Sequence, residues 1–77
     1  MSINQRVANN IRQLCVERGM KISELERMCG VSGGYFANAA SLDAQMRFSV
    51  VYEAANILDV TLESLIERCA DYGYNNR

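Results

Sequence analysis

The stretch ISELERMCGVSGGYF, residues 22–36, predicts two helices joined by a tight turn. Leu25 and Cys29 are spaced to share one face of the first helix, and Phe36 resumes an apolar stripe beyond the turn. Gly30 separates the two segments. Because glycine has no Cβ, it enters the left-handed backbone region without a clash and lets the second helix leave at a steep angle. This spacing is that of a helix-turn-helix.

The rest of the chain also carries apolar residues at helical spacing, and strand-like alternation is almost absent. We expect five helices, at about residues 4–18, 22–29, 33–40, 47–58 and 62–69. The predicted fold class is therefore all-α, a compact five-helix domain over residues 1–70. Residues 71–77 are expected to form a loosely ordered C-terminal tail.

Glycines and short polar residues mark the expected helix ends. Gly19 and Asp59 follow the first and fourth helices, at positions where a left-handed residue is often needed. Thr61 is the expected N-cap of the fifth helix and Ser32 that of the third. The end of each predicted helix therefore has a residue suited to it.

Two details of the helices rest on pattern alone. Ser23 and Glu26 form a capping-box pattern, which would start the second helix slightly later than Ile22. In the fourth helix the apolar stripe predicts a buried set, namely Phe48, Val51, Ala55 and Leu58.

Composition restricts the class of protein. The 77 residues carry a net charge of −1, with basic residues in excess over residues 1–52 and acidic residues in excess over 53–77. The net charge argues against a nucleic-acid partner, and its uneven distribution weakens that argument. We find no leader-like segment and no stretch near the ~20 apolar residues of a membrane span, so we expect a soluble cytoplasmic protein without a membrane partner.

Catalytic and metal-binding patterns are absent from the sequence. The chain has no histidine, and Cys15, Cys29 and Cys69 are too far apart for a zinc knuckle. We expect buried, reduced thiols, no metal and no cofactor. No acid pair or glycine-rich phosphate loop stands out either, so the sequence predicts that the protein is not an enzyme.

From residue 11 to residue 66 the chain resembles the lambda repressor/Cro family of helix-turn-helix regulators, also called the Xre family. The matching residues are Leu25, Gly30, Val31, Ser32 and Phe36, followed by Ala55, Leu58, Val60, Thr61, Leu65 and Ile66. The run from Ser32 to Tyr35 is similar to the Ser-Asn-Gly-Tyr run at the recognition helix of many members. The resemblance implies a five-helix fold and a transcriptional repressor that binds a near-palindromic operator in double-stranded DNA as a homodimer.

The resemblance places the candidate DNA contacts on and around the third helix. Tyr35 is expected to point outward and, with Asn38, to contact base edges. Positioning contacts to the DNA backbone are expected from residues bordering that face, namely Lys21, Ser32, Ser41 and Arg47. Gly33 and Gly34 would let the start of the helix approach the groove closely.

The same region departs from the family pattern. Ile22 replaces a polar residue that usually opens the second helix, and no Lys or Arg occurs from Gly33 to Ser41. The helix therefore lacks the groups that most often read guanine. A second hypothesis is consequently a protein-binding module on the same fold, for example a phage or mobile-element inhibitor or an antitoxin-like partner.

The C-terminal part offers a short apolar seam. Ile66, Cys69 and Tyr72 recur at roughly helical spacing and are the predicted homodimer interface. The alternative is that Ile66 and Cys69 only complete the core of the monomer.

Overall fold

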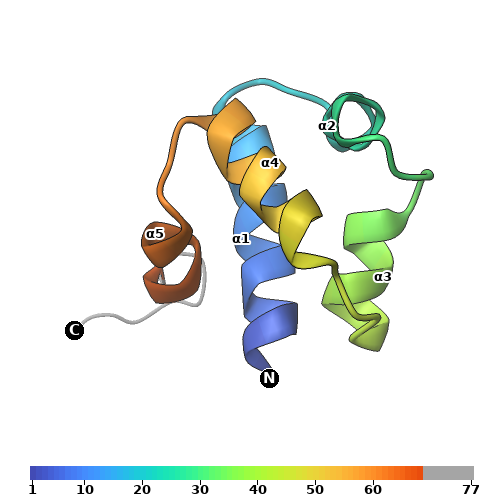
Figure 1. Ribbon diagram of the computed structural model, residues 1–77, viewed down its shortest axis with the longest axis vertical. Helices are drawn as coiled ribbons and strands as arrows, with labels where there is room; N and C mark the ends of the chain where they lie inside the picture. Colours follow the sequence, from blue (N-terminus) through green and yellow to red (C-terminus); the bar gives the residue numbers. More distant parts are fainter. Residues whose placement is uncertain (69–77) are drawn as a thin grey trace.

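The computed structural model describes residues 1–68 and is all-helical over that range. Its five helices are α1 Ile3–Glu17, α2 Ile22–Cys29, α3 Tyr35–Leu42, α4 Phe48–Leu58 and α5 Leu62–Glu67. Figure 1 shows α1 near the middle, with α4 across it and α3 and α5 on opposite sides. The predicted all-α class is confirmed, and the predicted tail at residues 71–77 lies outside the described range.

The central helix α1 begins with a complete capping box. Ser2 Oγ accepts a hydrogen bond from the Gln5 N–H, and Gln5 Oε1 accepts one from the Ser2 N–H, both at 3.0 Å. These bonds satisfy amides that a helix start otherwise leaves without partners. The apolar face of α1 then packs into the core through Val7, Ala8, Ile11, Leu14 and Cys15.

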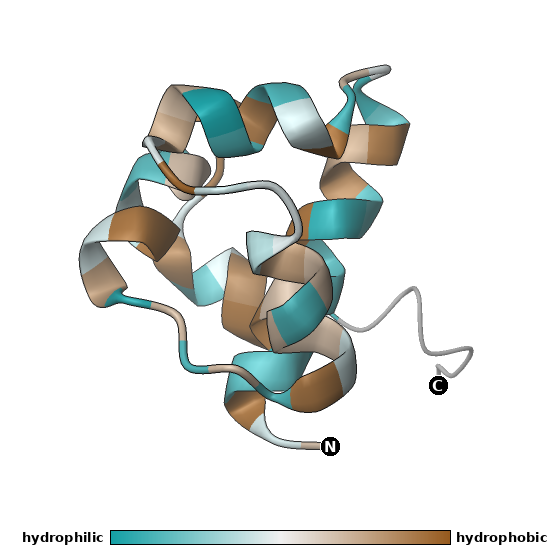
Figure 2. Cartoon of the chain, turned by 90° about the vertical axis from the view of Figure 1, so that its right-hand side faces the viewer, coloured by the Kyte–Doolittle hydropathy of each residue, from teal (hydrophilic) through white to brown (hydrophobic). Residues whose placement is uncertain are grey.

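One hydrophobic core lies between all the helices. Its largest fully buried apolar side chains are Ile11, Leu25, Phe36, Leu58 and Leu65, one from each helix. Full burial of such a side chain contributes about 1.5–3 kcal/mol. Figure 2 shows brown and teal residues alternating around the helices, as expected of amphipathic helices around a shared core.

The expected left-handed positions are confirmed. Gly30 ends α2 at φ 74°, and the N–H groups of Gly30 and Val31 donate to the carbonyls of Arg27 and Glu26, at 3.1 and 3.0 Å. This pair of bonds is a Schellman ending, which satisfies the last carbonyls of the helix. Gly19 and Asp59 have φ values of 67° and 59°.

The fifth helix is fixed at both ends. Thr61 Oγ1 accepts from the Ser64 N–H at 3.0 Å, which confirms the expected cap. At the other end Asn10, fully buried on α1, donates from Nδ2 to the carbonyls of Leu65 and Arg68. Arg68 in turn forms an ion pair with Glu17. A buried amide of α1 thus closes α5, which consists of only 6 residues.

Three details of the predicted helices were wrong. The third helix begins at Tyr35 with Gly34 as N-cap, so Ser32 does not cap it. Glu26 does not take part in a capping box, because the acceptor at the start of α2 is Glu24 Oε1, 3.3 Å from the Lys21 nitrogen. In α4, Phe48 is 71% exposed and Val50 occupies the core instead, at 4%.

Candidate nucleic-acid interface

The helices α2 and α3 form the predicted helix-turn-helix. Figure 1 shows α2 nearly end-on with α3 below it, joined by the loop of residues 30–34. Phe36 and Ala39 fix α3 to the core, where both are completely buried. The opposite face of the helix is exposed, with Asn38, Ser41 and Leu42 on it. The fold therefore presents one side of α3 to solvent.

The first turn of α3 is closed by a buried carboxylate from α2. Glu26 is 3% exposed, and its Oε2 accepts a hydrogen bond from the Phe36 N–H at 3.2 Å. A negative charge is favourable here, because the N-terminus of a helix carries a partial positive charge. The Phe36 amide is therefore not available to a phosphate.

The two glycines before α3 differ in what the fold requires of them. Gly34 has φ 88°, so a side chain there would strain the backbone. Gly33 has no such constraint, and a Cβ added to it would meet nothing within 4 Å. Neither the backbone angle nor the packing of the described residues demands glycine at position 33. Gly33 is exposed to solvent.

Tyr35 was expected to point outward, but the fold partly encloses its side chain. Its side chain is half-buried, and its ring packs edge-on against Phe36 with the centroids 5.3 Å apart. The hydroxyl accepts a hydrogen bond from the Arg47 N–H at 2.8 Å, at the start of α4. Tyr35 therefore connects the start of α3 to the start of α4. Its hydroxyl keeps a proton to donate, but the ring is held in place by the fold.

Of the other predicted contacts on α3, Asn38 remains suited to its role. It is exposed on the outer face, and its amide can donate and accept at once. Ser41 is also exposed, but its hydroxyl already donates to the Ala37 carbonyl at 2.8 Å. Such a bond within a helix leaves the hydroxyl only as an acceptor.

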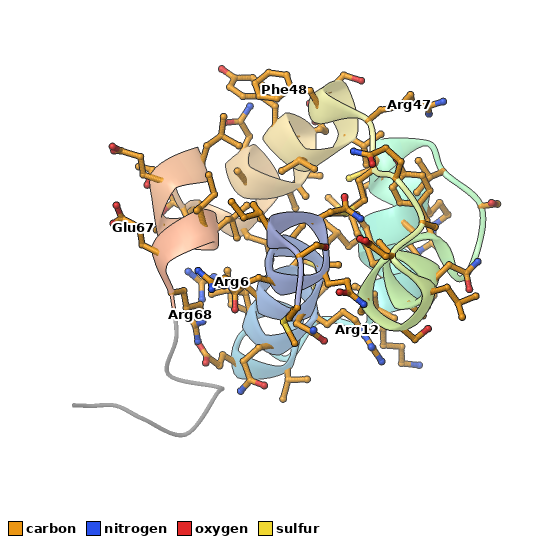
Figure 3. The ribbon with its side chains drawn as sticks, turned by 90° about the horizontal axis from the view of Figure 1, so that it is seen from below. Arg6, Arg12, Arg47, Phe48, Glu67 and Arg68 are labelled. Carbon is orange, nitrogen blue, oxygen red and sulfur yellow. The ribbon has the colours of Figure 1, made fainter. Side chains whose placement is uncertain are left out.

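The positive charges of this region lie outside α3. Lys21 precedes α2 and Arg47 precedes α4, and both are exposed. An open pocket of about 550 Å³ lies at the start of α2, with Arg12 and Lys21 among the residues that line it. Figure 3 shows Arg12 pointing away from α1. Two cations beside a helix start form a suitable place for a backbone phosphate.

The C-terminal end of α3 is acidic. Asp43 accepts hydrogen bonds from Asn4 Nδ2 at 2.9 Å and from Ser2 Oγ at 2.8 Å. These two bonds hold the pKa of the exposed Asp43 carboxyl below its ordinary value, so the group is ionised at neutral pH. From Gly33 to Met46 the chain has no Lys or Arg to balance this charge.

The remaining predicted sites are only partly covered by the structure. Ile66 is 40% exposed, whereas Cys69 and Tyr72 lie outside the described residues.

Burial raises the pKa of the Cys15 thiol above its ordinary value, with a further contribution from the Glu26 charge. Within residues 1–68 no group of side chains could hold a metal ion, and no helix is long and apolar enough to cross a membrane.

Sequence reasoning missed two buried polar residues, Glu26 at the start of α3 and Asn10 at the end of α5. Glu26 was assigned to the start of α2, and Asn10 was not singled out at all, although both are buried. Each interrupts a run of core positions with a polar side chain, Asn10 beside Ile11 and Glu26 beside Leu25. A polar residue at such a position is a signal that a backbone group elsewhere needs a partner.

Comparison of the chain with models of known protein families, with curated proteins and with solved structures finds no match.

Proposed function

We propose that this domain is a DNA-binding regulator that presents α3 to the major groove of duplex DNA. The finer form of the proposal is a repressor that binds a near-palindromic operator as a homodimer. The observation that carries it is the helix-turn-helix itself: α2 supports α3 from behind, and the outer face of α3 is open to solvent.

Gly33 supports the same proposal. The fold has room for a side chain at position 33, so packing within the domain does not require glycine there. The missing side chain instead allows another molecule to approach the loop closely. Asn38, in the first turn of α3, is the residue best placed to read a base edge, with adenine as the natural partner of its amide. Lys21 and Arg12 would then hold a phosphate beside the start of α2.

The proposal is tested by fluorescence anisotropy with a library of random duplexes at low and high salt. We expect weak binding with a shallow salt dependence, about 3 to 5 phosphates neutralised per subunit, because few cations border the face. Asn38→Ala should lower the affinity for a selected duplex by roughly 1 to 3 kcal/mol. The matched control is Asn56→Ala, since Asn56 is an exposed asparagine on α4.

A second variant tests the approach of the loop. Gly33→Leu should leave the melting temperature nearly unchanged, because the added side chain meets open space, and should weaken DNA binding at least tenfold. Absence of any duplex binding at low salt contradicts the proposal. So does unchanged affinity in both Asn38→Ala and Gly33→Leu.

The second candidate function is a protein-binding module, and two observations favour it. Glu26 occupies the amide at the start of α3 that a phosphate would use, and Asp43 places a negative charge at the other end. An uncharged helix face with an exposed carboxylate at one end suits a protein surface better than a polyanion. If no duplex binds, the same two variants, Asn38→Ala and Gly33→Leu, become the probes for such a partner.

A further inference from the structure

The open pocket at the start of α2 is larger than a contact with the DNA backbone requires. It lies between the outer side of α1 and the first residues of α2, and we refer to it as the α1–α2 pocket. Its volume of about 550 Å³ falls within the range of about 300–1,000 Å³ that is typical of sites for small molecules. A single phosphate group fills only a small part of such a volume. The residues that line the pocket are Asn9, Arg12, Gln13, Cys15, Val16, Met20, Lys21, Ile22 and Ser23.

The charged groups of the α1–α2 pocket are both positive. Arg12 comes from α1 and Lys21 from the residue before α2, and both are exposed. Neither forms an ion pair within residues 1–68, and no acidic residue of that range lines the pocket. The carboxylate of Glu24 accepts the Lys21 N–H at 3.3 Å but is not part of the lining. The pocket therefore favours an anion, to which it offers two charged donors.

Uncharged polar groups stand beside the two cations. Gln13 is half-buried and Ser23 is exposed, and both line the pocket. Neither side chain forms a hydrogen bond within residues 1–68. Their amide and hydroxyl groups are therefore available to a ligand.

The α1–α2 pocket also has an apolar side. Val16 is 73% exposed, and Met20 and Ile22, which pack partly against the core, line the pocket with it. Ile22 stands where the resembling family usually has a polar residue, and the proposed DNA contacts make no use of this difference. Covering apolar surface is favourable, whereas a bare phosphate would leave Val16 and Ile22 in water. The pocket is therefore suited to a ligand that has an apolar part as well as a charge.

We propose that the α1–α2 pocket binds a small molecule in which an anionic group, a phosphate or a carboxylate, is joined to an apolar body. The anionic group lies at Arg12 and Lys21, and the apolar body covers Val16 and Ile22. Binding is measured without DNA, so the site itself does not depend on the proposed function. Competition between this ligand and duplex DNA for Arg12 and Lys21 does rest on the proposed function.

The test is a titration of the full chain with 1-naphthyl phosphate at about pH 8, followed by two-dimensional amide NMR. We expect a dissociation constant of about 1 mM or tighter, as is usual for a ligand of this size, with shifts confined to the amides of residues 9–23. Inorganic phosphate supplies the anion alone and 1-naphthol the apolar body alone. Each should bind at least about tenfold more weakly, because each uses only one side of the pocket.

Three substitutions of exposed lining residues test the two sides separately. Arg12→Gln and Lys21→Gln together should weaken binding of 1-naphthyl phosphate at least about tenfold. Val16→Gln should weaken binding of 1-naphthyl phosphate and leave that of inorganic phosphate unchanged. The matched controls are Arg27→Gln and Met28→Gln, exposed residues of α2 that do not line the pocket, and these should leave both affinities unchanged. Far-UV circular dichroism should be the same for all the variants.

Equal affinity for 1-naphthyl phosphate and inorganic phosphate overturns the proposal, because the site is then a simple phosphate contact such as a DNA backbone makes. Unchanged affinity in the double variant Arg12→Gln, Lys21→Gln also overturns it. So do amide shifts centred on the apolar groove beside α5, which has a volume of about 320 Å³ and is lined in part by Phe48 and Ile66.

Fluorescence anisotropy of a bound duplex measures the competition. At equal ionic strength, 1-naphthyl phosphate should displace the protein from the duplex at a lower concentration than inorganic phosphate does, and equal displacement overturns the competition. Binding of 1-naphthyl phosphate by a protein that binds no duplex contradicts the proposed function alone. Binding of a duplex by a protein that does not bind 1-naphthyl phosphate contradicts the pocket proposal alone.

Discussion

Replacing Glu26 tests how the helix-turn-helix is held together. Glu26 belongs to α2, yet its carboxylate accepts the Phe36 N–H at 3.2 Å and is almost completely buried. The bond joins the two helices of the motif directly across the turn. In Glu26→Ala the Phe36 amide loses its acceptor at a site that water does not reach.

The size of the effect follows from that geometry. A hydrogen bond to a charged group contributes about 1.5–3 kcal/mol, and 3.2 Å is at the long end of the normal range, so a value near the lower limit applies. We expect Glu26→Ala to lower the free energy of unfolding by about 2 kcal/mol. For a domain of this size such a change lowers the melting temperature by roughly 8–16 °C.

Glu26→Gln should have a smaller effect than Glu26→Ala. The amide oxygen can still accept the Phe36 N–H, and only the interaction of the charge with the helix start is lost, about 0.3–1 kcal/mol. Part of that loss is offset because a neutral group is less costly to bury than a carboxylate. The order wild type, Gln, Ala is therefore the expected order of stability.

The free energies of unfolding of the three proteins are measured by urea denaturation, monitored by circular dichroism. Glu24→Ala is the control, since Glu24 also accepts a backbone N–H, from Lys21 at 3.3 Å, but is exposed. Its replacement should change the free energy of unfolding by less than about 1 kcal/mol. If Glu26→Ala unfolds at the same urea concentration as Glu24→Ala, the buried bond does not hold the motif together and the reasoning is refuted.

Two further predictions concern the turn and the end of α3. Gly30→Val should destabilise the domain by about 1–2 kcal/mol, because Gly30 has φ 74°, whereas Gly33→Val, at a site without that constraint, should cost clearly less in the same thermal melts. Asp43 has a folded-state pKa below its ordinary value of 3.8, so its contribution to stability is present above that pH and is lost as the pH falls through the lower folded-state pKa. Asparagine tolerates the left-handed φ of 58° at this position, so Asp43→Asn should fold without showing this loss of stability in acid. An identical acid transition in the two proteins would contradict the role given to the Asp43 carboxylate.

The parts of the fold that follow from neighbouring residues were predicted well. Gly30 and Asp59 occupy left-handed positions and Thr61 caps α5, and each of these features depends on residues within one helical turn. The second helix was likewise placed correctly at Ile22–Cys29. Local patterns determine such features because the groups that satisfy each other are close in the sequence.

The errors involve partners that are distant in the sequence. The start of α3 depends on Glu26, whose carboxylate accepts a hydrogen bond from the Phe36 N–H, ten positions later. Ser32 was predicted as the cap because that carboxylate was not considered. Tyr35 was assigned to the outer face because its bond to the Arg47 N–H could not be foreseen from α3 alone. Sequence periodicity carries no information about such pairings.

The error in α4 has a different origin. A stripe through Phe48 and Val51 and a stripe through Val50 and Ala54 are both compatible with one apolar face, since the helix is rich in apolar residues on more than one side. The rotation of the helix is decided by how it docks on α1 and α2, which the sequence of α4 does not specify. A helix with two apolar stripes buries only one against its own core.

Gly33 and Phe48 raise the same physical question. The packing of the described residues requires neither, because a side chain at position 33 meets open space and the side chain at position 48 is 71% exposed. An exposed phenylalanine is unfavourable in water, and a glycine in a loop adds to the entropy lost on folding. Residues that the fold does not need are explained most simply by contacts with another molecule. Gly33 belongs to the loop before α3 and Phe48 to the groove beside α5, so the two contacts use different elements and one chain can make both.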